Sequence, residues 1–106
     1  MPKFLIKGSY TAEGTKGLKK DKASGREKAI SAAVKALGGK LDGVWYALGD
    51  VDIYAVIDVP SHVHAAALGA TVGASGQATV STTALLTVAE MDQALSETVT
   101  YRAPGA

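Results

Sequence analysis

Residues 41–59, LDGVWYALGDVDIYAVIDV, decide the fold of this chain. They hold two largely apolar stretches, 41–48 and 51–59, which Gly49 and Asp50 separate, and both of these residue types favour turns. The pattern predicts two neighbouring strands. On either side of this stretch, the sequence predicts further strands at residues 4–9 and 77–86 and helices at residues 24–37 and 61–74. This order predicts an α+β fold of the ferredoxin-like type, βαββαβ, in which two helices cover one face of an antiparallel sheet.

Capping signals mark where helices begin. Ser24 and Glu27 have the spacing of a capping box, in which each side chain bonds the backbone of the other residue, and Thr87 and Glu90 repeat it. The second pair predicts a short helix that begins near Thr87 and runs to about residue 95.

The segment from Thr11 to Lys20 is harder to assign, because Gly14 and Gly17 each weaken a helix by about 1 kcal/mol relative to alanine. We expect one or two helical turns there, followed by a mobile basic loop over residues 15–23. The tail, residues 98–106, is expected to add a short strand through Tyr101.

Alternation along the strands divides the side chains between two sheet faces. The face beneath the helices is expected to hold Trp45 and Ala47, and the other face Val44, Tyr46 and Leu48. This second face also receives polar side chains, and such a mixed face is typical of a sheet that meets another sheet or lines a cavity. The apolar residues are mostly small, so the core of the single domain, 1–106, is expected to be thin. We therefore predict a homo-oligomer, at least a dimer.

Composition narrows the class of partner. The formal net charge of +1 predicts no strong attraction to nucleic acid or to an anionic membrane. Lysines cluster between residues 16 and 28, but acidic residues interrupt them, which is typical of a solvated surface. The chain has no cysteine, which excludes disulfides and thiolate chemistry and fits a cytoplasmic protein. No apolar run approaches the length of about 20 residues that a membrane-spanning helix needs.

Four residues are candidates for binding a small organic ligand. Alternation places Asp52 on the mixed face beside Tyr54, where a carboxylate with tyrosines nearby can anchor a ligand or act as a general base. Tyr10 ends the first strand and His64 lies near the start of the second helix. Packing in an interface between copies would explain the positions of the tyrosines equally well. The sequence assigns no catalytic residue.

The residues favour two other chemistries less, a metal site and a catalytic base at the N-terminus. His62 and His64 point to nearly opposite sides of a helix, so they are not a metal-binding pair, and no metal or cofactor is expected. Pro2 would become a secondary amine, and a possible base, if Met1 were removed, as in the tautomerase superfamily. The hairpin at residues 49–50 fits that superfamily's βαβ units poorly.

Four segments of this chain resemble the GYD domain family of small bacterial proteins: Tyr10-Thr11-Ala12-Glu13-Gly14, Gly38-Gly39-Lys40, Gly49-Asp50-Val51-Asp52 and Thr82-Thr83. The family is named for a Gly-Tyr-Asp signature, which is matched here by Gly49 and Asp52, with Val51 where the tyrosine usually stands. The resemblance implies a ferredoxin-like fold of the dimeric α/β barrel group. It implies no particular activity, because that group includes metal-free oxygenases and isomerases as well as proteins that only bind ligands or assemble.

Two functions therefore stay open at the level of sequence. The first is a small-molecule binding protein or cofactor-free enzyme, with a pocket at the sheet face of an oligomer. The second is a non-catalytic oligomeric module, regulatory or scaffolding, in which the same polar residues only satisfy an interface. A tautomerase-like enzyme that uses Pro2 is the third alternative.

Overall fold

The computed structural model describes residues 1–106 and contains a four-stranded sheet and three helices. In chain order the elements are β1 (Lys3–Tyr10), α1 (Ala12–Ala36), β2 (Lys40–Tyr46), β3 (Ile53–Asp58), α2 (His62–Ala74), β4 (Ala78–Leu85) and α3 (Val88–Ser96). The first six elements follow the predicted βαββαβ order, so the α+β, ferredoxin-like fold is confirmed.

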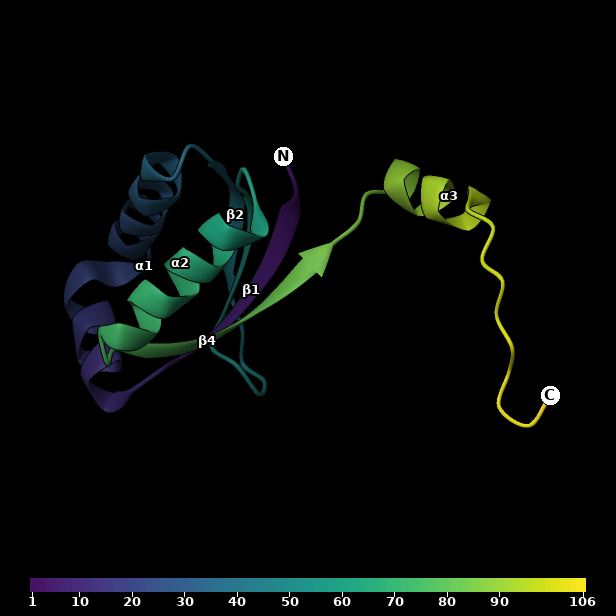
Figure 1. The fold of residues 1–106 in the computed structure, drawn as a ribbon. Coiled ribbons are helices and arrows are strands. Elements are labelled where there is room, and N and C mark those ends of the chain that lie inside the picture. Colours follow the sequence, from purple (N-terminus) through teal and green to yellow (C-terminus); the bar gives the residue numbers. More distant parts are fainter.

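The sheet is antiparallel throughout, and its strand order is β2-β3-β1-β4. The N-terminal strand therefore lies inside the sheet, and β2 and β4 form the edges. Helices α1 and α2 cover one face of the sheet (Figure 1). We call the other face the open face; register assigns to it Leu5, Lys7, Ser9, Trp45, Tyr54, Val56, Thr79, Ser81, Thr83 and Leu85.

The hydrophobic core is small, as the composition predicts. It consists of five buried residues from β1, β3, the following loop and the two helices: Phe4, Val34, Ile57, Val59 and Ala65. Only 9 of 106 residues are buried, so most apolar side chains of this chain keep some contact with solvent. A core of this size leaves each buried side chain with a large share of the stability.

The expected loop over residues 15–23 is wrong, because this segment is helical. Helix α1 starts at its N-cap Thr11, whose hydroxyl accepts a hydrogen bond from the Gly14 amide at 3.1 Å. The helix continues to a kink at Lys22, where φ is 65° and ψ is 167°, a conformation that side chains rarely adopt. The kink takes the place of the helix start predicted at Ser24. Anchoring of the first turn by Thr11 outweighs the low helix propensity of the glycines.

The faces predicted for β2 are also wrong. A register shift between Leu41 and Gly43 adds one residue to β2, so Leu41 and Val44 both lie on the helix side. From that point Tyr46 pairs with Ile53 on the helix side, and Trp45 pairs with Tyr54 on the open face. Trp45 is 58% exposed, so it lies outside the core.

Beyond β4 the chain leaves the folded body. We call residues 1–85 the body and residues 86–106 the arm, and Figure 1 shows the arm extending away from the sheet and helices. The predicted capping box is confirmed: the Thr87 hydroxyl accepts from the Glu90 amide, and the Glu90 carboxylate accepts from the Thr87 amide at 2.8 Å. The strand expected through Tyr101 is not formed, because no neighbouring strand lies beside the tail to pair with it.

Candidate functional site

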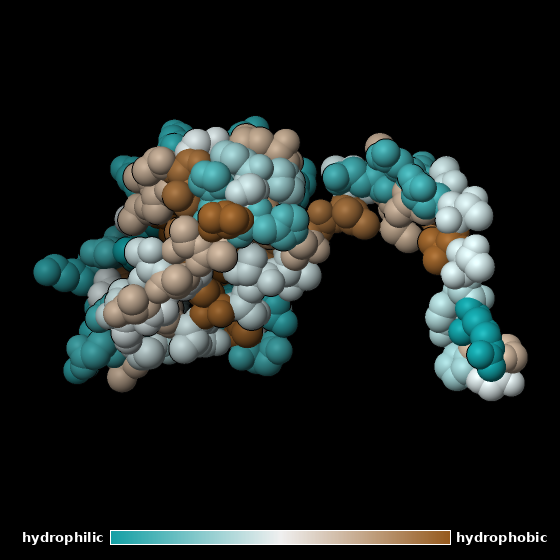
Figure 2. Space-filling model, in the orientation of Figure 1, coloured by the Kyte–Doolittle hydropathy of each residue, from teal (hydrophilic) through white to brown (hydrophobic).

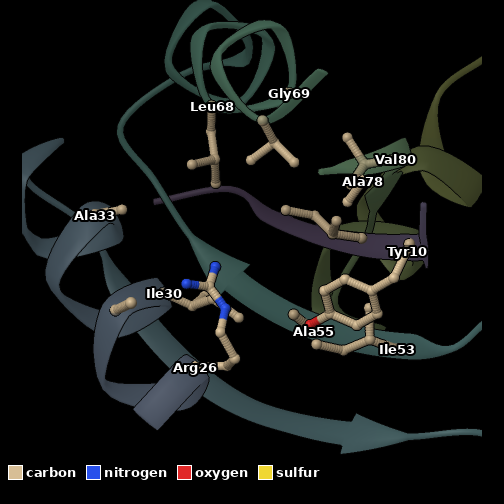
Figure 3. Close-up of a pocket in the computed structure, with 14 residues that line it drawn as sticks. Tyr10, Arg26, Ile30, Ala33, Ile53, Ala55, Leu68, Gly69, Ala78 and Val80 are labelled. Atoms are coloured by element: carbon tan, nitrogen blue, oxygen red, sulfur yellow. The ribbon is translucent and has the colours of Figure 1, made fainter. Parts of the chain in front are cut away.

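An apolar cavity of about 150 Å³ lies between the two helices and the sheet. Its lining comes from α1, α2 and three strands: Ile6, Gly8, Tyr10, Arg26, Ala29, Ile30, Ala33, Ile53, Ala55, Leu68, Gly69, Val72, Ala78 and Val80. Figure 3 shows side chains converging on this space from α2 at the top, α1 at the left and the strands of the sheet. The cavity is thus on the helix side of the sheet, not on the mixed face where the sequence places a pocket.

Small side chains keep this space open. In α1 the residues that face it are Ala29, Ile30 and Ala33, which follow the helical spacing of three and four. In α2 Gly69 faces the sheet, and the strands contribute Ala55 and Ala78 to the floor. Larger residues at these positions would fill the space, so the hollow is a direct result of the Ala- and Gly-rich sequence.

Two polar side chains of the lining, Tyr10 and Arg26, lie at the rim of the cavity, and Tyr46 lies next to Tyr10. Tyr10 and Arg26 reach into it from opposite sides with their polar ends turned towards each other (Figure 3). The Tyr10 hydroxyl lies 3.5 Å from the Tyr46 hydroxyl, at the outer limit of a hydrogen bond. Arg26 also lies 3.8 Å from Asp21, but both side chains are partly exposed, so this ion pair is weak. The lining therefore offers a guanidinium and a phenol to a ligand, and the Tyr46 phenol lies beside that of Tyr10.

The environment of Tyr46 reinforces the protonated state that a tyrosine already has at neutral pH. Removal from water is the main cause that raises the pKa of the Tyr46 phenol well above its ordinary value, and the hydrogen bond with Tyr10 raises it further. The positive charge of Arg26 opposes this shift but does not reverse it. Tyr46 therefore stays protonated at neutral pH and remains able to donate a hydrogen bond.

The structure brings two of the four candidate residues together, Tyr10 and Asp52. The Asp52 carboxylate accepts a hydrogen bond from the Tyr10 backbone amide at 2.8 Å, and the Asp52 amide donates to the Gly8 carbonyl at 2.8 Å. The prediction that Asp52 lies in a strand beside Tyr54 is wrong, because β3 begins only at Ile53 and Asp52 belongs to the preceding bend. Asp52 thus fastens the β2–β3 loop to the end of β1 and positions Tyr10.

The other two candidates lie elsewhere. Tyr54 is on the open face, opposite Trp45 and Lys7 in the register, so the sheet separates it from the cavity. His64 lies in the first turn of α2, where its Nδ1 is 2.7 Å from the hydroxyl of the N-cap residue Ser61. Neither side chain lines the cavity with Tyr10.

Comparison with models of protein families shows which family this chain belongs to. The family model described as GYD domain matches residues 4–95, which is most of the chain. The chain belongs to the GYD domain family. No curated protein and no solved structure matches it significantly.

Within this GYD domain, the segment that resembles the family signature, residues 49–52, lies in the bend before β3. Asp52 makes the contact with Tyr10 described above, so this residue holds the end of β1 next to the cavity rim.

Two rim residues, Arg26 and Tyr46, were not among the sequence candidates. Arg26 precedes Ala29 and Ile30 by three and four positions, so it is a charged residue on the apolar stripe of α1, and that is a usable sequence signal. Tyr46 was assigned to the opposite face because simple alternation ignores the bulge in β2.

No group of three or more His, Cys, Asp or Glu side chains is arranged to hold a metal ion. None of the three helices combines the length and the apolar character needed to cross a bilayer.

Proposed function

We propose that this protein binds a small carboxylic acid with an apolar body in the cavity between the helices and the sheet. The observation that carries the proposal is the combination of an apolar cavity with the Arg26 guanidinium and the Tyr10 hydroxyl in its lining and the Tyr46 hydroxyl beside that of Tyr10. Ligand sites of this kind are mostly apolar, with a few polar groups that fix the orientation of the ligand.

Size and charge indicate the class of ligand. An apolar cavity of about 150 Å³ accommodates a body the size of benzene. At the rim, a guanidinium matches the geometry of a carboxylate and can form two parallel hydrogen bonds to it. The phenols of Tyr10 and Tyr46 add neutral donors beside that charge. A neutral or cationic head group would leave the positive charge of Arg26 without a counter-charge. The polar groups of the site therefore favour an anionic ligand.

Binding alone is the form of this function that the geometry supports best. Catalysis without a cofactor would need a base near the ligand, and Tyr46 is held in its protonated form. The carboxylate nearest in the structure to Tyr10, that of Asp52, already accepts the Tyr10 amide hydrogen. A cofactor-free enzyme is therefore the less supported version of the first function.

Benzoate tests this proposal because it has the expected size and charge. In an amide-resolved NMR titration, benzoate should shift the resonances of cavity residues such as Ala33 and Ala55. Arg26→Met keeps the length of the side chain and removes its charge, and we expect it to weaken benzoate binding about tenfold to a hundredfold, the worth of a hydrogen bond to a charged group. Tyr10→Phe should weaken binding by a smaller factor.

Toluene is the matched control, because it has the same ring without the carboxylate. Its binding should be the same in Arg26→Met and in the unchanged protein. Lys35→Met, a second charge removal on α1 at an exposed position, should leave benzoate binding unchanged. Equal benzoate affinity in Arg26→Met, or shifts confined to surfaces outside the cavity, would contradict the proposal.

We also propose that the protein is a homo-oligomer, at least a dimer, that buries its open face. This face has no covering layer in the single chain, yet it carries Leu5, Val56 and Trp45. Sheet faces of this composition are usually packed against another layer. The resemblance to the dimeric α/β barrel group implies a dimer as well.

Sedimentation velocity at micromolar concentration should therefore show a dimer or larger species. Trp45→Glu, which places a charge on the open face, should shift this species towards monomer. The control is Val63→Glu, which changes an apolar side chain that is 75% exposed on α2, and it should leave the sedimentation coefficient unchanged. Monomer alone at these concentrations would refute the proposal.

The structure favours no role for Pro2. Its carbonyl accepts a hydrogen bond from the Val59 amide at 3.2 Å, and it precedes β1 at the end of the strand opposite to Tyr10. It does not line the cavity. The cytoplasmic location and bacterial origin expected from the sequence stay predictions.

A further inference from the structure

The arm accounts for an unusual amount of exposed surface. The radius of gyration of the chain is 16.9 Å, whereas a compact domain of this length has about 13 Å. The accessible surface is 7173 Å², compared with about 5,500 Å² for a compact monomer of the same mass. All residues from Leu86 onward are exposed. Figure 2 shows apolar residues exposed along the arm and where it leaves the body.

Helix α3 is formed by the sequence but is too short to persist alone. It has nine residues, and isolated helices shorter than about 12–15 residues are marginal in water. Its capping box nevertheless fixes its start at Thr87. One side of it carries Val88, Met91 and Leu95, at helical spacing and 82%, 46% and 71% exposed. Such an amphipathic helix gains its stability from a surface that covers this stripe.

That surface is not available on the same chain. Strand β4 ends at Leu85 and the N-cap of α3 is Thr87, so Leu86 alone connects them. A chain reversal takes a four-residue turn. Folding α3 back onto its own sheet would therefore break either the end of β4 or the capping box. The arm instead continues in the direction of β4, away from the body (Figure 1).

The open face of a second copy provides a surface of matching chemistry. It combines apolar side chains, such as Leu5 and Val56, with a shallow hollow lined by Lys7, Ser9, Val51, Thr79, Val80 and Ser81. Charge complementarity rests on one side chain: Lys7 lies on this face and forms no ion pair in the structure, and the arm, with three acids and one arginine, has a net charge of −2.

We propose that α3 of each copy packs, through Val88, Met91 and Leu95, onto the open face of a second copy. The exchange is reciprocal, so it closes as a two-fold dimer in which each arm covers the face that the other chain leaves bare. This inference rests on the homo-oligomer proposed above and adds the element that holds it together. It also explains why a nine-residue helix with a complete capping box has all its residues exposed.

The first experiment changes the stripe in the full-length chain. In Met91→Glu/Leu95→Glu both changes are at exposed positions of the arm, so the body should keep its fold and its melting behaviour at low concentration. Sedimentation should show a dimer for the unchanged protein and a monomer for this variant. The matched control is Gln93→Glu, on the opposite side of α3, which should remain a dimer.

The outcomes separate the two proposals. A monomeric unchanged protein overturns both the oligomer and the arm exchange. A dimer that persists in Met91→Glu/Leu95→Glu but is lost in Trp45→Glu leaves the open-face oligomer standing and overturns the arm exchange.

The second experiment locates the arm by disulfide cross-linking, which has no background because the chain contains no cysteine. Two full-length variants of different mass, one with Leu95→Cys and one with Val56→Cys, are mixed and oxidised. A disulfide between the two chains is expected, in higher yield than when Gln93→Cys replaces Leu95→Cys. An equal yield would overturn the proposal. So would an internal disulfide, within a monomer, in the double variant Leu95→Cys/Val56→Cys, because it would place the arm on its own chain.

Discussion

Phe4→Ala is expected to lower the free energy of unfolding by about 3–5 kcal/mol, the usual cost of removing a buried phenylalanine. Phe4 is 2% exposed and packs with Val34, Ile57, Val59 and Ala65, which form the whole core cluster. Its ring also meets the ring of His62 edge-on at 5.1 Å. Small domains have only about 5–15 kcal/mol of stability, so this loss is a large fraction of the total.

Chemical denaturation and thermal unfolding measure this effect. The melting temperature should fall by more than about 10 °C, given the sensitivity of domains of this size. Leu48→Ala is the control, because Leu48 is fully exposed in the β2–β3 loop and its removal should change stability by less than about 0.5 kcal/mol. Similar losses in the two variants would show that Phe4 does not occupy the centre of the core.

Gly14→Ala is expected to destabilise the protein by about 3 kcal/mol, at the upper end of the usual cost of overpacking. A Cβ atom at Gly14 would lie 1.9 Å from the Gln77 carbonyl oxygen and 3.1 Å from the Tyr10 ring. The Gln77 carbonyl is backbone and cannot rotate away. It also accepts a hydrogen bond from the Thr11 amide at 2.9 Å, so a shift would disturb the start of α1 as well.

Gly17→Ala provides a control of opposite sign in the same helix. No heavy atom lies within 4 Å of a Cβ built at Gly17, so alanine there should raise stability by about 0.5–1 kcal/mol through its better helix propensity. Urea denaturation of the two variants measures both changes. Because Gly14 adjoins Tyr10, benzoate binding should also weaken in Gly14→Ala and not in Gly17→Ala. Stabilisation by both substitutions would mean that α1 does not approach the α2–β4 loop.

Much of the fold follows from local signals in the sequence. The turn at residues 49–50 separates two apolar runs, and both strands form on either side of it. The capping box at Thr87 and Glu90 forms because its requirements lie within one helical turn. Composition also predicts the thin core, since the apolar residues are mostly small.

The candidate site cannot be predicted from local sequence signals in the same way, because it depends on tertiary contacts. The bulge in β2 reverses the faces of Trp45 and Tyr46, and simple alternation cannot reveal it. The helix that begins at Thr11 depends on Gly14 fitting closely against Gln77, a residue far away in the sequence. The cavity itself arises from small side chains on five different elements, whose meeting is known only once they are packed.

The position of β1 inside the sheet has a consequence for how the chain folds. β1 is the first strand to be synthesised, yet Lys3 pairs with Leu85, so one of its edges stays open until β4 follows. Contacts of such long sequence separation slow folding, because a large loop must close before they form. During that delay β1, with Phe4 and Ile6, presents an unpaired apolar edge, which is a site for misassociation with other chains. Pairing of β4 with β1 thus removes this open edge and leaves β4 as the edge strand of the sheet.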